Sequence, residues 1–140
     1  MFSLIPVGVA IAVAVTFILL AVNAKPDITA VPRRHRVVTT ALPIADAVYR
    51  LRDIAGQPQH KYRFALEDPQ RQVFVLEDDL SAVSYGNFYP CFVQAVDGGT
   101  QVTVGLQSKA PQWGPVPARR LNKFTAVVAE AVGGTVSEQR

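Results

Sequence analysis

An uninterrupted apolar run near the amino terminus constrains this chain more than any other feature. From Leu4 to Val22 the sequence holds no charged residue. Its one polar side chain, Thr16, can donate its hydroxyl proton to a carbonyl oxygen one turn earlier in a helix. A helix of this length spans roughly 28 Å, close to the thickness of the hydrocarbon core of a membrane. Residues 1–24 are therefore predicted to form a transmembrane anchor.

A cleaved secretory signal is the alternative interpretation of the same run, because Val22-Asn23-Ala24 fits a cleavage site. Signals normally begin with basic residues and have a shorter apolar core. The start of this chain, Met1-Phe2-Ser3, carries no basic residue, and the run is long. The sequence therefore favours a retained anchor.

Basic residues follow the run and predict its orientation. Lys and Arg close to a span tend to stay on the cytoplasmic side. This pattern predicts a single-pass plasma-membrane protein with its amino terminus outside and its domain in the cytoplasm. Residues 25–35, which include Pro26 and Pro32, read as an extended tether. Its arginines either contact anionic lipid head groups or serve only as a topology signal. The basic residues are Lys25, Arg33, Arg34 and Arg36.

The remaining chain predicts one α+β domain over residues 36–133, with a flexible tail over 134–140. Helical spacing of apolar residues indicates helices over 43–55 and 118–132. Alternation and turn signals indicate two hairpins, one turning at Asp68-Pro69-Gln70 and the other at Asp97-Gly98-Gly99. The predicted strands are 36–40, 62–67, 72–77, 87–96 and 101–107.

This order predicts an antiparallel sheet of about five strands with both helices on one face, since that arrangement buries both apolar helix stripes. The order of elements resembles the helix-grip family of lipid-binding and polyketide-cyclase-like domains. In that family, a curved antiparallel sheet wraps a long carboxyl-terminal helix. The resemblance implies a similar fold for residues 36–133.

The sequence offers no catalytic, cofactor-binding or metal-binding pattern. His35 and His60 do not lie at ligand spacing from each other or from Cys91, which reads as a small buried hydrophobe. The acidic pair Asp78-Asp79 reads as solvated, because no calcium-loop pattern follows it. The net charge of +3 comes without a dense basic stripe, which argues against nucleic acid as a partner. We therefore expect a non-enzymatic chain without cofactors.

Contact features stand out instead. Trp113 lies in a proline-bounded loop, where it either meets a partner or closes the domain's own core. Tyr85, Phe88 and Tyr89 fall in an aromatic stretch that alternation spreads over both faces of a strand. Gly8 and Ala12 would let another helix approach the apolar run closely. The predicted partner or membrane contacts are Gly8, Ala12, Arg33, Arg34, Arg36, Tyr85, Phe88, Tyr89 and Trp113.

An anchored domain without catalytic groups predicts an accessory subunit of a larger membrane assembly. One amino-terminal span followed by a small Ala/Val/Arg-rich domain is similar to small accessory subunits of actinobacterial respiratory complexes, namely of the cytochrome aa3 oxidase in the bcc-aa3 supercomplex. That resemblance implies a supporting role among other integral membrane subunits, which would hold the haem and copper. The alternative is a membrane-tethered binder of lipid or a small apolar ligand. It predicts a cavity of a few hundred Å3 lined by Phe and Val, and a filled interface between sheet and helix would contradict it.

Overall fold

Two antiparallel strands with clean alternation form the centre of the sheet. The computed structural model describes residues 4–78, 86–111 and 114–137. β4 (Asn87–Val96) pairs with β5 (Gly99–Gly105), and the turn between them places Gly98 at φ +81°, a left-handed conformation that favours glycine. Val102 and Val104 of β5 are fully buried on one face, as the alternation predicts.

The second hairpin extends the sheet on the other side of β4. β2 (Arg63–Asp68) pairs with β3 (Val73–Glu77), and β3 pairs with β4. The Asp68 carboxylate accepts hydrogen bonds from the backbone N–H groups of Gln70 and Arg71, at 3.1 and 3.2 Å, and so closes the turn. The β2–β3 register shifts between Phe64 and Leu66, which indicates a bulge in β2.

The described residues form one antiparallel seven-stranded sheet, so the predicted number of about five strands is wrong. Its order is β2-β3-β4-β5-β1-β7, and β6 (Gln107–Ser108) pairs with β4. β1 (His35–Thr40) pairs with β5 and with β7 (Thr135–Ser137). Thr135–Ser137 falls in the segment that the sequence assigned to a tail, because three exposed residues carry no alternation that marks a strand.

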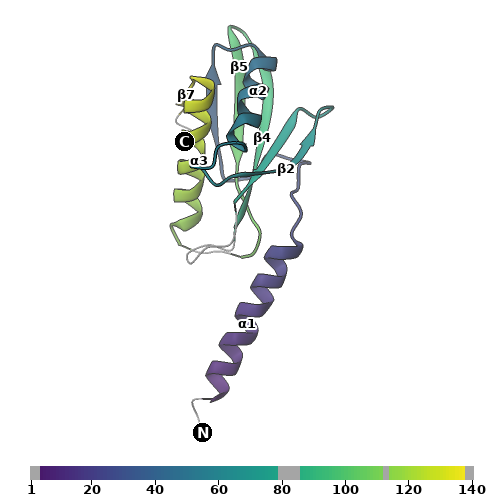
Figure 1. The fold of residues 1–140 in the computed structure, drawn as a ribbon, viewed down its shortest axis with the longest axis vertical. Helices are drawn as coiled ribbons and strands as arrows, with labels where there is room; N and C mark the ends of the chain where they lie inside the picture. Colours follow the sequence, from purple (N-terminus) through teal and green to yellow (C-terminus); the bar gives the residue numbers. More distant parts are fainter. Residues whose placement is uncertain (1–3, 79–85, 112–113, 138–140) are drawn as a thin grey trace.

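Both domain helices cover the same face of this sheet (Figure 1). α2 (Ile44–Ile54) follows β1, and α3 (Val116–Val132) is the long helix near the carboxyl end. Gly133 ends α3 in the left-handed conformation, with φ +61° and ψ 35°. The helix residues buried in the core are Ala47, Leu51, Ile54, Leu121, Phe124, Val128 and Val132.

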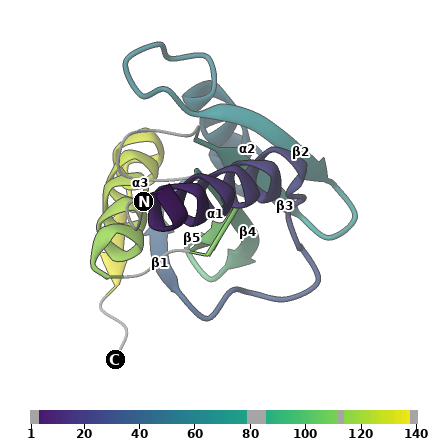
Figure 2. The same cartoon turned by 90° about the horizontal axis from the view of Figure 1, so that it is seen from below.

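The segment between α1 (Leu4–Asn23) and β1 lies across the opposite face of the sheet (Figure 2). Ala24 and Ile28 pack against a small cluster that includes Val75 and Phe88. The side-chain amide of Gln107 accepts a hydrogen bond from the backbone N–H of Asp27 at 2.9 Å and donates one to the Asp27 carbonyl. The segment predicted as a tether is therefore docked on the sheet by packing and by a pair of hydrogen bonds.

α1 (Leu4–Asn23) is a helix that extends away from the domain, and the side chains described in it are mostly exposed (Figure 1). As the sequence predicts, the Thr16 hydroxyl donates to the Ala12 carbonyl, at 2.8 Å. The predicted membrane span is contradicted, because no helix among the described residues is both long and apolar enough to cross a membrane. This finding also overturns the predicted single-pass plasma-membrane location.

The docked segment predicts a specific cost for a side chain at Gly105. A Cβ atom there would lie 2.6 Å from both Cγ and Cδ of Pro32, so Gly105→Ala should lower the free energy of unfolding by about 1–3 kcal/mol. Pro32→Ala removes those two ring atoms. The free energy of unfolding of the double variant should therefore be about 1 kcal/mol higher than the sum of the two single effects predicts. Urea denaturation of the four chains measures this cycle.

Gly8→Ala is the matched control for this cycle, because a Cβ atom at Gly8 meets nothing within 4 Å. We expect it to leave the unfolding of the domain unchanged. Equal stability of Gly105→Ala and the unmodified chain would contradict the docking of Pro32 on β5.

Candidate functional site

The space between α3 and the sheet is filled by three buried aromatic rings. Tyr62, just before β2, sets its ring edge-on to Tyr89 of β4 and Phe124 of α3, with ring centroids 5.7 and 4.9 Å away. Tyr89 and Phe124 lie 4.3 Å apart, with 32° between their ring planes. The alternative expectation from the sequence is a ligand cup between the sheet and the long helix. The chain's own side chains fill this space.

A buried carboxylate holds the end of Tyr89. The Asp78 carboxylate accepts two hydrogen bonds. The Tyr89 hydroxyl oxygen lies 2.6 Å from Oδ2, and the backbone nitrogen of Asn87 lies 2.7 Å from Oδ1. Burial, with the nearby Asp78 carboxylate, raises the pKa of Tyr62 to about 12 and also raises the pKa of Tyr89, so both hydroxyls stay protonated at neutral pH. The prediction of a solvated acidic pair is wrong for Asp78, and Asp79 lies outside the described residues.

An apolar cleft lies beside this filled interior, between one flank of α2 and the β2–β3 hairpin. It has a volume of about 360 Å3. Its walls are apolar side chains from α2 and from strands β3 and β4: Ile44, Ala45, Val48, Val73, Phe74 and Val93. Its rim is polar and comes from α2 and from the turn of the hairpin: Arg52, Glu67, Asp68, Pro69 and Gln72. We call this space the α2–hairpin cleft.

Helical spacing explains why α2 presents one apolar flank to this cleft. Ala47, Leu51 and Ile54 form the buried stripe that packs on the sheet. Ile44 and Val48 form a neighbouring row on the helix, next to this buried stripe. Their side chains are only partly buried and line the cleft. Arg52 continues this row by four residues, which places its guanidinium group at the rim.

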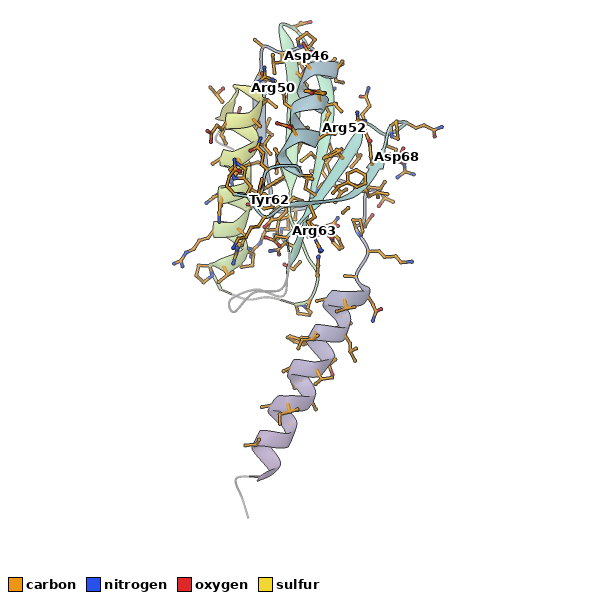
Figure 3. All side chains as sticks on the ribbon, viewed as in Figure 1. Asp46, Arg50, Arg52, Tyr62, Arg63 and Asp68 are labelled. Atoms are coloured by element: carbon orange, nitrogen blue, oxygen red, sulfur yellow. The ribbon has the colours of Figure 1, made fainter. Side chains whose placement is uncertain are left out.

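Two pairs of opposite charges lie at the rim, one of them with its arginine, Arg71, just outside the cleft lining. Arg52 of α2 forms an ion pair with Glu67 of β2, which joins the two walls of the cleft. Asp68 lies 3.7 Å from Arg71 and accepts the two turn N–H groups described above. Figure 3 shows Arg52 on the side of α2 that faces β2, with Asp68 beyond it near the hairpin turn.

A larger groove of about 830 Å3 lies on the other flank of α2, against α3. Its lining is mainly polar and includes Asp46, Arg50 and Asp53, and Tyr49 there is 73% exposed. Arg50 points toward α3 and contacts the Ala131 carbonyl at 3.5 Å (Figure 3). Because the lining of this larger groove is polar and charged, the smaller apolar cleft is the better candidate for a small-molecule site.

The predicted contact residues do not gather at either site. Phe88 and Tyr89 are buried on opposite faces of β4, in the two apolar clusters of the sheet. Tyr85 and Trp113 lie outside the described residues. Gly8 and Ala12 lie on exposed turns of α1, where a Cβ atom added at Gly8 would meet no neighbour.

The predicted basic contacts lie before and at the start of β1, away from the cleft. Arg33 and Arg34 are exposed, while Arg36 is half-buried and donates to the His35 carbonyl at 2.9 Å. The His35 ring shares a hydrogen bond with the Pro32 carbonyl at 2.9 Å. Among the described residues, no group of three or more His, Cys, Asp or Glu side chains could hold a metal ion.

Sequence reasoning missed the residues of the cleft. The spacing of Ile44, Val48 and Arg52 marks a second row on the predicted helix, next to its buried stripe. That row is a usable signal, because its two apolar residues are only partly buried against the core and its third residue is a charge at the surface. Phe74 and Val93 carry no such signal, since each reads as an ordinary inward strand residue.

Comparison with known proteins shows the fold and nothing more specific. No protein-family model and no curated protein matches the sequence. The chain is similar in structure to the crystal structure of Ara h 8.0201, with a TM-score of 0.51 and 9% sequence identity. The similarity covers 70% of this chain and 92% of that chain. It supports a Bet v 1-like helix-grip arrangement of the antiparallel sheet and helices.

These findings correct the predicted function. A single-pass accessory subunit of a respiratory membrane complex requires a span, and none is found among the described residues. The structural comparison instead supports a helix-grip domain, whose resemblance suggested the alternative of a small-ligand binder.

The filled interior predicts an unreactive Cys91, which is the only cysteine of the chain. Burial raises the pKa of its thiol to about 12, so at pH 8 only about 1 in 10,000 thiols is ionised in the folded chain. Alkylation by iodoacetamide should be slower in the native protein than in concentrated guanidinium chloride by at least about 100-fold. Similar rates in the two conditions would contradict the packing around β4.

Proposed function

We propose that this chain is a non-catalytic binder of a small apolar ligand, and that the ligand lies in the α2–hairpin cleft. The single observation that carries this proposal is the cleft of about 360 Å3, whose walls include Val48, Phe74 and Val93. Ligand sites in proteins are concave, mostly apolar, roughly 300–1,000 Å3 in volume and equipped with a few polar groups. The α2–hairpin cleft meets each of these conditions.

The chemistry of the lining favours binding over catalysis. The walls consist of aliphatic and aromatic side chains that cannot transfer protons or attack a substrate. Of the two rim carboxylates, Glu67 is paired with Arg52 and Asp68 is bound to turn N–H groups. Among the described lining residues, no histidine, cysteine, serine or lysine accompanies these carboxylates, so the cleft offers neither a nucleophile nor a second proton-transfer group beside them.

The fold agrees with this proposal but places the ligand in a different position from the one expected. The resemblance to lipid-binding helix-grip domains suggests a ligand between the sheet and the long helix. Tyr62, Tyr89 and Phe124 fill that space here. That filling contradicts the expected ligand position between sheet and helix. The site proposed here is a different one, the α2–hairpin cleft, whose lining also includes Phe and Val side chains.

An uncharged fluorophore tests whether the cleft binds apolar molecules. N-phenylnaphthylamine should bind the full chain with a dissociation constant on the order of 10 μM, as expected for a small ligand that buries most of its surface. Val48→Trp places an indole in the cleft and should weaken binding by at least about tenfold. Fluorescence titration measures both constants.

Matched variants separate loss of the site from loss of the fold. Val127→Trp adds the same ring at a partly buried position of α3 that lines the larger groove and not the cleft, so it should bind like the unmodified chain. Ala45→Trp fills the cleft from an exposed position and replaces Val48→Trp if the latter unfolds. The proposal is wrong if the probe does not bind the unmodified chain, or if a folded cleft-filling variant binds it equally well.

A further inference from the structure

Each carboxylate at the rim of the α2–hairpin cleft already has a cationic partner without a ligand. The rim carries two carboxylates, and each has an arginine partner: Glu67 with Arg52, and Asp68 with Arg71. Asp68 is further committed to the turn through its bonds with the Gln70 and Arg71 N–H groups. Arg71 lies outside the cleft lining, so a ligand that enters the cleft meets one arginine and two carboxylates, each of which already has a cationic partner at or beside the rim.

A charged head group would have to break this balance. A ligand carboxylate at Arg52 would compete with Glu67, whose side chain is only 24% exposed and would lose part of its pairing in a poorly hydrated position. A ligand ammonium at Glu67 would compete with Arg52, which is 53% exposed. In either case one charge of the original pair loses its partner.

An uncharged hydroxyl group fits the intact pair. A guanidinium group has five N–H donors, and among the described residues the Arg52 side chain uses one nitrogen, Nη2, to reach Oε1 of Glu67. The other carboxylate oxygen of Glu67 accepts no hydrogen bond from the described residues. A ligand hydroxyl can accept a hydrogen bond from an N–H group of Arg52 and donate a hydrogen bond to the second carboxylate oxygen of Glu67, while the Arg52–Glu67 ion pair stays intact.

We infer that the ligand is an uncharged amphiphile whose apolar chain lies against Val48 and Phe74 and whose hydroxyl group lies at the Arg52–Glu67 pair. This inference rests on the proposed function and assigns to one ion pair the selection of the head group. The pair also fixes the orientation of the ligand, because it is the polar group that joins the two walls of the cleft.

A series of ligands with one chain and three head groups tests this inference. Decanol, decanoate and protonated decylamine share their alkyl chain and differ in charge. Competition with N-phenylnaphthylamine on the full chain at pH 7 should show decanol binding about fivefold more tightly than either ion, the range expected for an exposed ion pair. Raised salt should narrow these differences, because it screens the rim charges.

Two variants should reverse the preference in opposite directions. Glu67→Gln leaves Arg52 without its carboxylate, so decanoate should become the tightest ligand of the three. Arg52→Gln leaves Glu67 without its cation, so decylamine should become the tightest. Glu130→Gln and Lys123→Gln are controls that change the same charges on α3, outside the cleft lining, and should keep the original order.

The outcomes separate this inference from the proposed function. Equal affinities for the three ligands, or an order that neither rim variant changes, would overturn the selection by Arg52 and Glu67 while the cleft remains a binding site. Tighter binding of decanoate or decylamine than of decanol to the unmodified chain would overturn it as well. Failure of every ligand to displace the probe, together with no effect of Val48→Trp, would remove the proposed function itself.

Discussion

The contact between Phe124 of α3 and Tyr89 of β4 determines how the rest of the domain is arranged. These rings lie 4.3 Å apart, and Tyr62 closes on both of them from the segment before β2. Asp78 fixes the hydroxyl of Tyr89, so the ring cannot turn aside without leaving a carboxylate buried with one partner fewer. The long helix is therefore held down on the sheet, and no room for a ligand remains beneath it.

The cleft follows from this arrangement. With α3 seated on the sheet, α2 takes the remaining part of the same face and buries Ala47, Leu51 and Ile54 there. The β2–β3 hairpin then runs out at an angle to β4 and β5, and β2 contains a register shift between Phe64 and Leu66 (Figure 1). Because the hairpin turns away from α2, the flank carrying Ile44 and Val48 is only partly covered. The Arg52–Glu67 pair joins α2 and β2 across the rim of that opening.

The local part of the fold could be predicted from the sequence, while the long-range part could not. Alternation at Val102 and Val104 and the turn chemistry of Asp68 and Gly98 identify both hairpins, because each signal lies within a few residues. The pairing of Asp27 with Gln107 joins residues 80 positions apart, and no local pattern encodes it. β7 is too short and too exposed to show an alternation of its own.

The predicted transmembrane span shows a different limit. The prediction rests on the length and composition of one run alone, whereas the described residues contain no helix that is long and apolar enough to cross a membrane. The aromatic stretch has its rings on both faces of β4, as alternation predicts: Tyr89 lies in the apolar cluster on one face of the sheet and Phe88 in the cluster on the other. The sheet buries apolar side chains on both faces, because the docked segment 24–32 covers the face opposite the helices. A sheet covered on one face only would need fewer aromatic residues.

The candidate site was hidden from sequence reasoning because its two walls belong to different parts of the chain. Arg52 and Glu67 are 15 residues apart, and each alone reads as a solvated charge on an element surface. Only the row Ile44, Val48 and Arg52 hints that one flank of α2 has its own environment. That row indicates a separate cleft only because the space between α3 and the sheet is filled. If that space were an open cavity, the same side chains would line it. The filled aromatic interior and the open flank of α2 thus both follow from the packing of α3 on the sheet. The proposed ligand site therefore lies at the flank of the domain and not at its centre.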